Sequence, residues 1–186
     1  MQGIPLNERK RLGALLDDRP QTEVMAMIPQ FSQAETDNFV APPAKIPEAL
    51  GVLMFNMERG VNLPEIQEFL RDCPDIQPFD VILANELDDG CARSGNKNTA
   101  RELAQAFGLN YAWGLEFIEL VNDENAKGFH GNAVFSRWPV RRCASGGRST
   151  SYTARADGSH RHGGWASGRK QRCHGSPWRF HHSPAR

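Results

Sequence analysis

The chain has 186 residues, enough for one domain with a substantial core but short for two. Its formal net charge of zero hides an uneven distribution of charge. Residues 141–186 hold ten Lys or Arg and one Asp, so 12 of the 22 basic residues and 21 of the 22 acidic residues lie before position 141. Neither a signal-peptide core nor an apolar run of about 18 residues occurs, so we expect a cytoplasmic protein without a membrane span.

Residues 1–48 are expected to form an N-terminal helix followed by a proline-rich leader. Within residues 6–18, the apolar spacing of four leucines is typical of one helical face: Leu6, Leu12, Leu15 and Leu16. The segment APPAKIP, residues 41–47, contains three prolines, which interrupt regular structure. We therefore place the start of the next domain at residue 49.

Residues 49–140 alternate between strand-like and helix-like patterns. GVLMFNM (51–57) and FDVILANE (79–86) are short continuous apolar runs of the kind found in buried strands. LPEIQEFLRDC (63–73) follows a plausible cap at Asn62 and is predicted to be a helix. TARELAQAFG (99–108), capped by Asn98 or Thr99 and ended by Gly108, is predicted to be a second helix.

Two further strands complete the predicted sheet. The apolar face expected in NYAWGLEFIELV (110–121) consists of Tyr111, Trp113, Leu115, Phe117 and Glu119. NAVFSRW (132–138) is the last strand before the composition changes. The pattern predicts the α/β class, with helices packed on a mainly buried sheet of parallel type.

Residues 141–186 contain no Leu, Ile, Val or Met and are rich in Arg, Gly, Ser and His. Such a segment buries too little apolar surface to offset the entropy of ordering, so we expect a disordered, low-complexity basic tail. Translation of a GC-rich gene in the wrong frame from about codon 140 explains this composition best. The alternative is a non-catalytic nucleic-acid-binding protein whose basic, aromatic tail contacts phosphates and bases.

Polar side chains end the two buried strands, Asn56 on the first and Glu86 on the second. Ligands usually bind at the carboxyl ends of such strands, and Mg²⁺ prefers oxygen ligands that include one or two carboxylates. The residues alone leave another interpretation open, in which Asn56 caps a turn and Glu86 is a solvated strand end. The neighbouring Glu58 and Asp88 are expected to be solvated charges rather than groups that orient the metal ligands.

The order of these motifs resembles the amino-terminal half of the endonuclease/exonuclease/phosphatase family. The resemblance covers residues 51–140 and rests on LMFNMERG, DVILANELDD and GFHGNAVFSRWPV in that order. It implies an incomplete DNase I-like two-sheet sandwich with flanking helices. It also implies a phosphoester substrate, with nucleic acid as one candidate class, and Mg²⁺ or Mn²⁺ as the cofactor.

The family resemblance assigns roles to specific residues. It implies that Glu86 binds the metal and that Asn56 binds the metal or hydrogen-bonds to metal-bound water or phosphate, so that both are catalytic. His130 and Asn132 are weaker candidates for substrate contacts. The family's later Asp-x-Asn and Asp-His motifs have no counterpart after Val140, where Asp157 is the one acidic residue. We therefore expect a truncated or frameshifted phosphoesterase with little activity and an uncovered apolar sheet face.

Overall fold

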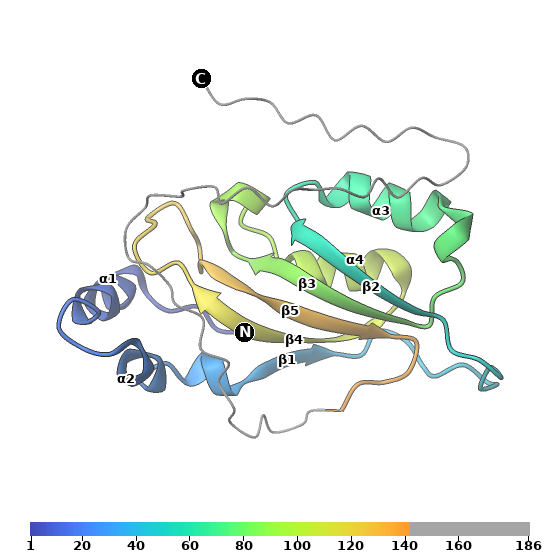
Figure 1. Cartoon of the computed structure of the whole chain (residues 1–186), viewed down its shortest axis with the longest axis horizontal. Coiled ribbons are helices and arrows are strands. Elements are labelled where there is room, and N and C mark those ends of the chain that lie inside the picture. The colour runs from blue at the N-terminus through green and yellow to red at the C-terminus, as the bar shows by residue number, and fades with distance from the viewer. Residues whose placement is uncertain (142–186) are drawn as a thin grey trace.

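The computed structural model describes residues 1–141. The predictions for the tail therefore concern residues that, from position 142 on, lie outside the described part. The described residues form an α/β structure in which five strands make one mixed sheet (Figure 1). None of the helices within residues 1–141 is long and apolar enough to cross a membrane.

The sheet has the strand order β1-β4-β5-β3-β2. Its strands are β1 (Ala34–Asp37), β2 (Val52–Arg59), β3 (Val81–Asp89), β4 (Asn110–Ile118) and β5 (Phe129–Ser136). Only β2 and β3 pair in parallel, whereas β1 with β4, β4 with β5 and β5 with β3 are antiparallel. The expectation of a parallel-type sheet therefore holds only for the β2 and β3 pair, which carries Asn56 and Glu86.

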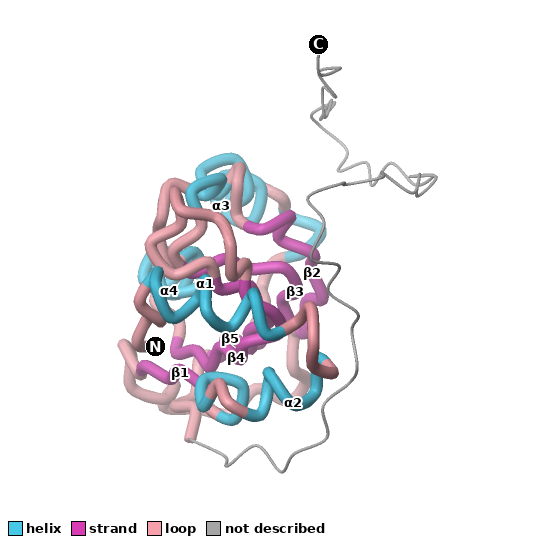
Figure 2. Tube along the Cα trace, turned by 90° about the vertical axis from the view of Figure 1, so that its left-hand side faces the viewer, coloured by secondary structure: helices cyan, strands magenta, loops and turns pink. Residues whose placement is uncertain are grey.

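The helices lie beside the sheet and in the N-terminal segment (Figure 2). They are α1 (Leu6–Leu15), α2 (Gln21–Ala26), α3 (Leu63–Asp72) and α4 (Thr99–Phe107), with short 3-10 turns at Pro29–Ser32, Pro74–Ile76 and Ala92–Ser94. Helix α4 contacts β3 and β4, and α3 contacts α4. Asn98 caps α4 as expected, because its side chain accepts a hydrogen bond from the Arg101 N–H at 2.8 Å. Asn62 occupies the corresponding position before α3 but makes no capping hydrogen bond.

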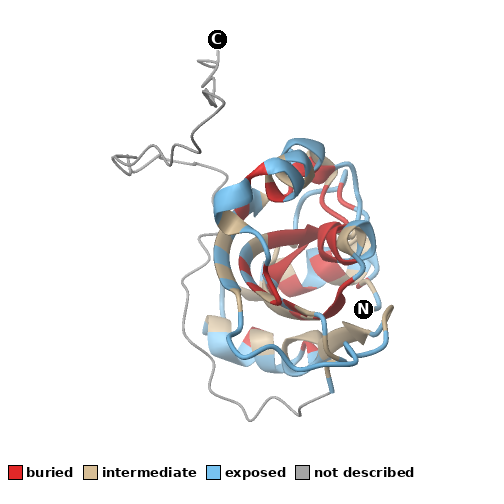
Figure 3. Ribbon diagram, turned by 90° about the vertical axis from the view of Figure 1, so that its right-hand side faces the viewer, coloured by how far each residue is buried: buried red, intermediate tan, exposed pale blue. Residues whose placement is uncertain are grey.

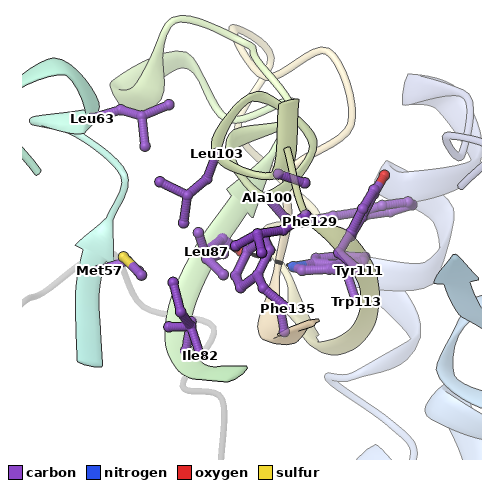
Figure 4. Packing of buried hydrophobic residues seen from close by; sticks show 14 of the residues in the cluster. Met57, Leu63, Ile82, Leu87, Ala100, Leu103, Tyr111, Trp113, Phe129 and Phe135 are labelled. Atoms are coloured by element: carbon purple, nitrogen blue, oxygen red, sulfur yellow. Dashed lines mark hydrogen bonds between the residues drawn. The ribbon is translucent and has the colours of Figure 1, made fainter. Parts of the chain in front are cut away.

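The core lies between the sheet and helices α3 and α4, as Figures 3 and 4 show. Its largest fully buried side chains include Trp113, Tyr111, Phe129, Phe135 and Met57. The Trp113 indole N–H donates to the Leu87 carbonyl at 3.3 Å, so this large side chain has its polar atom satisfied inside the core.

The N-terminal segment contributes to the same structure. Strand β1, which the sequence pattern does not predict, pairs with β4 at one edge of the sheet. Ile4, Leu12, Val24 and Ile28 are buried in the core cluster. Arg9, which is 2% exposed, donates to the carbonyl oxygen of Asn125 at 2.7 Å and so fixes α1 to the loop between β4 and β5.

The opposite face of the sheet is open within the described residues. Val52, Met54, Leu83 and Val134 are between 36% and 75% exposed on this open face. The expectation that helices cover a mainly buried sheet is therefore met on one face only. Contiguous apolar surface of this kind marks a place for further contacts or a source of aggregation.

Candidate functional site

The carboxyl end of β2 leaves regular strand geometry directly after Asn56. The register with β3 runs from Asn56 opposite Asn85 to Arg59 opposite Leu87, so two residues of β2 face one of β3. Glu58 and Arg59 have φ angles of 47° and 66°, which non-glycine residues rarely adopt. The Asn56 side-chain oxygen accepts a hydrogen bond from the Glu58 N–H at 2.8 Å and so stabilises the local turn.

Strand β3 has its own bulge at Glu86. Ala84 pairs with Ala133 and Leu87 pairs with Gly131, so Asn85 and Glu86 lie opposite Asn132 alone. Glu86 has a φ angle of 57°. Bulges and left-handed non-glycine residues cluster near functional sites, where they redirect a side chain at a cost in backbone strain. The bulge therefore gives Glu86 an orientation that a regular strand would not provide.

Four residues form a connected polar row across β2, β3, β5 and β4, in which the link between Glu86 and Asn132 is made by the Glu86 backbone. The Asn56 amide nitrogen donates to Glu86 Oε1 at 2.9 Å, and the Glu86 backbone N–H donates to Asn132 Oδ1 at 3.2 Å. The Asn132 amide nitrogen then donates to Glu116 Oε2 at 3.2 Å. We call Asn56, Glu86, Asn132 and Glu116 the polar row. The structure thus brings together three residues predicted from the sequence and adds Glu116.

The two carboxylates of the polar row have no cationic partner among residues 1–141. Neither Glu86 nor Glu116 forms an ion pair within residues 1–141, although nearby Asp88, Asp89 and Glu119 do. Within this part of the chain, Glu86 Oε2 and Glu116 Oε1 also accept no hydrogen bond. Within the described residues, an amide therefore binds one oxygen of each carboxylate, and the other oxygen has no hydrogen-bond partner there. Carboxylate oxygens are ligands that Mg²⁺ prefers, and Glu86 and Glu116 lie on strands β3 and β4, which β5 separates.

An apolar hollow of about 370 Å³ adjoins the polar row on the open face. Asn85 and Asn132 line it together with small or aliphatic residues that include Ala112, Gly114 and Val134. A second hollow of about 390 Å³, near Phe107 and Arg137, includes no residue of the polar row. The first hollow is therefore the one next to the candidate cation ligands.

His130, a weaker candidate for a substrate contact in the family resemblance, is buried. It lies in β5, its Nδ1 is 2.8 Å from Asp88 Oδ1, and its ring packs against Phe117 at a tilt of 30° with centroids 4.3 Å apart. His130 makes no hydrogen bond to the polar row within the described residues. The structure therefore joins His130 to Asp88 rather than to Glu86.

Asp88 is fully buried, so the expectation of a solvated charge was wrong for this residue, whereas Glu58 is exposed as expected. Arg93 binds both Asp88 oxygens, at 2.7 and 2.9 Å, and the Ser94 hydroxyl donates to Oδ2 at 3.2 Å. Burial alone would raise the pKa of Asp88, but hydrogen bonds from His130 and Arg93 outweigh it and lower the pKa. Asp88 is therefore an ionised carboxylate inside the protein.

Glu116 is the site residue that sequence reasoning missed. On the predicted strand, Glu116 shares a face with Ala112, Gly114 and Ile118. A carboxylate among these small and apolar residues is the one sign in the sequence that could have identified it. A register shift between Leu115 and Phe117 also breaks the predicted apolar face. Because of this shift, Phe117 pairs with His130 and does not continue the buried face of Trp113 and Leu115.

No group of three or more His, Cys, Asp or Glu residues able to hold a metal ion occurs in the part of the chain that the structure describes. The polar row offers its two carboxylates, whereas the side-chain oxygens of Asn56 and Asn132 already accept hydrogen bonds from the Glu58 and Glu86 N–H groups. Comparisons with protein-family models, curated proteins and solved structures find no match to this chain.

Proposed function

We propose that residues 49–140 form the cation-binding half of a metal-dependent phosphoester hydrolase. The observation that carries the proposal is the polar row, in which two amides hold two carboxylates that have no cationic partner within the described residues. Mg²⁺ or Mn²⁺ is the cofactor that suits these oxygen donors.

The finer fold assignment belongs to the same proposal. In a two-sheet sandwich, an apolar face of one sheet packs against the other sheet. The described α/β unit has a mixed sheet with one open apolar face, as expected for the first sheet of a DNase I-like sandwich. Asn56 and Glu86 end neighbouring parallel strands, in the order expected from the resemblance to the endonuclease/exonuclease/phosphatase family. Together, the motif order and the open face support membership of that family.

The residues of the polar row have distinct roles in this proposal. Glu86 binds the cation through its free oxygen, and Asn56 holds the other oxygen by its amide N–H. Asn132 fixes the Glu86 backbone and contacts the substrate, while Glu116 balances the cation charge from β4, on the far side of β5 from Glu86. A bound divalent cation would neutralise charge that develops on the phosphate oxygens.

We expect little hydrolytic activity from this chain. The sequence after Val140 has one acidic residue, Asp157, and so lacks the Asp-x-Asn turn expected to orient the attacking water. Loss of a general base commonly lowers the rate by about 10² to 10⁴-fold. Cation binding is therefore the direct test of the proposal, and turnover is a secondary one.

The experiment measures Mn²⁺ binding to the full chain by electron paramagnetic resonance, with Mg²⁺ competition. We expect one site whose affinity falls at least about tenfold in Glu86→Gln. Glu65→Gln is the matched control, because Glu65 is an exposed carboxylate on α3, away from the polar row. Equal affinity in the two variants would overturn the proposal. Any hydrolysis of bis(p-nitrophenyl) phosphate that persists in Glu86→Ala is contamination.

A further inference from the structure

The second hollow, of about 390 Å³, lies at the end of the sheet away from the polar row. Ser136, the last residue of β5, pairs there with the first residues of β3 and β4. Phe79, Leu109 and Arg137 adjoin these strand ends and line the hollow, together with Phe107 at the C-terminal end of α4. Its volume lies within the range of small-molecule sites, about 300 to 1,000 Å³. The hollow is therefore a candidate ligand site separate from the proposed cation site.

Aromatic and aliphatic side chains make up most of the lining of this hollow. The Phe79 and Phe107 rings meet edge to face, with centroids 5.8 Å apart and an interplanar angle of 61°. Phe79 is buried in the core, whereas Phe107 is only partly buried and contributes accessible ring surface to the hollow. Aromatic rings pack well against other rings in edge or offset-stacked contacts. The lining therefore suits a ligand with a flat aromatic body.

Arg137 is the one charged residue among the described residues that line the hollow. Its backbone N–H donates to the Asp80 carbonyl oxygen at 3.1 Å, and its Nε donates to the Phe79 carbonyl oxygen at 3.1 Å. Asp80 Oδ1 lies 3.5 Å from the same Nε. The two terminal amino groups, Nη1 and Nη2, make no hydrogen bond or ion pair within residues 1–141. The side chain is 45% exposed, so these two groups are accessible to a ligand.

The charge and geometry of Arg137 favour a carboxylate over other anions. The two oxygens of a carboxylate can accept from two N–H groups of one guanidinium, which makes the pair directional as well as strong. Arg137 supplies a single positive charge, and Asp80 lies near its Nε, so a monoanion matches the site better than a phosphate dianion does. The lining and the charge thus point to the same class of small molecule.

We propose that this hollow binds a small aromatic carboxylate. The ring of the ligand contacts Phe79 and Phe107, and its carboxylate accepts hydrogen bonds from the terminal amino groups of Arg137. None of the lining residues belongs to the polar row, so the site is independent of the proposed phosphoester hydrolysis. A neutral analogue of the same shape leaves the guanidinium without its partner, and an anion without a ring leaves the apolar lining in water. Binding therefore requires both parts of the ligand.

The experiment is isothermal titration calorimetry of the full chain with 2-naphthoate, its neutral counterpart 2-naphthylmethanol, and acetate. We expect 2-naphthoate to bind at one saturable site, and the other two compounds to bind at least about tenfold more weakly. Arg137→Gln should lower the affinity for 2-naphthoate at least about tenfold. Arg19→Gln is the matched control and should leave it unchanged, because Arg19 is an exposed arginine that does not line the hollow. Equal affinities for 2-naphthoate and 2-naphthylmethanol, or equal affinities of the two variants for 2-naphthoate, would overturn the proposal.

A second variant tests the place of binding without changing Arg137. Ala41 is exposed and lines the hollow, so Ala41→Trp should fill the space with little effect on the urea unfolding midpoint. Its affinity for 2-naphthoate should fall at least about tenfold, as expected when a ligand pocket is filled. Unchanged affinity in Ala41→Trp would place the ligand elsewhere on the protein and would also overturn the proposal. If Arg137→Gln unfolds, Ala41→Trp and the three compounds decide the outcome.

Discussion

The backbone N–H of Glu86 donates to the side-chain oxygen of Asn132 across 3.2 Å, and the nitrogen of the same amide holds Glu116 at 3.2 Å. One exposed asparagine on β5 therefore fixes the backbone of one acidic residue and the carboxylate of another. Both acidic residues lie at register shifts in the strands on either side. Asn132 is thus the central connection of the polar row.

We expect Asn132→Ala to lower the Mn²⁺ affinity of the full chain by about tenfold, as is typical when a residue that orients metal ligands is lost. The free energy of unfolding should fall by only about 1 kcal/mol, because the lost hydrogen bonds are exposed. Asn85→Ala is the matched control, since Asn85 is an exposed neighbour whose side chain makes no hydrogen bond within residues 1–141. Equal losses of affinity in both variants would show that Asn132 has no special role.

Gly131 and Gly114 lie on neighbouring strands beside the polar row but differ in the space around them. A Cβ atom on Gly131 would lie 2.0 Å from the Gly114 carbonyl oxygen and 2.8 Å from Trp113, whereas one on Gly114 would meet nothing within 4 Å. We expect Gly131→Ala to lower the free energy of unfolding by about 3 kcal/mol and Gly114→Ala by about 0.5 kcal/mol or less. Urea unfolding measures both, and similar values for the pair would contradict the close approach of β4 and β5.

Met54 and Met57 test the two faces of the sheet within one strand. Met54 is 75% exposed on the open face, whereas Met57 is 0% exposed in the core. Met57→Ala should cost about 2 to 5 kcal/mol of unfolding free energy, and Met54→Ala about 0.5 kcal/mol or less. Met54→Lys should also reduce concentration-dependent self-association, measured by light scattering. A large loss of stability in Met54→Ala would mean that the open face is covered in solution.

Local patterns in the sequence were sufficient to predict the central elements. The apolar runs that end at Asn56 and Glu86 are strands β2 and β3, and the 3.6-residue periodicity after Asn98 is helix α4. These signals are local, because they depend on side-chain spacing and on one capping residue. The α/β class and the closeness of Asn56 to Glu86 follow from them.

The features that shape the site depend on contacts between distant residues. The bulge at Glu86 exists only relative to its partner Asn132, and no local motif marks it. Asp88 resembles a solvated acid in the sequence because its partners His130 and Arg93 meet it only in the fold. Strand β1 has the sequence AETD, which shows no apolar alternation, and is defined by its pairing with β4.

Asp88 should make the stability of the protein depend on pH in the acidic range. Its pKa is lowered in the folded state, so the unfolded chain, with a pKa of about 3.9, binds the proton more readily. The stabilisation is therefore fully present above about pH 4 and is lost as the pH falls through the folded-state pKa. At neutral pH, Asp88→Asn should be less stable than the wild type by about 3 kcal/mol, because Arg93 and His130 lose a charged partner.

The difference between wild type and Asp88→Asn should shrink as the pH falls below about 4, since protonation removes the same charge from the wild type. Urea unfolding at a series of pH values measures this difference directly. Asp17→Asn provides the control, because Asp17 is exposed and forms no ion pair or side-chain hydrogen bond in the part of the chain that the structure describes. A gap that stays constant down to the lowest pH at which both proteins fold would mean that Asp88 is not an ionised partner of Arg93 and His130.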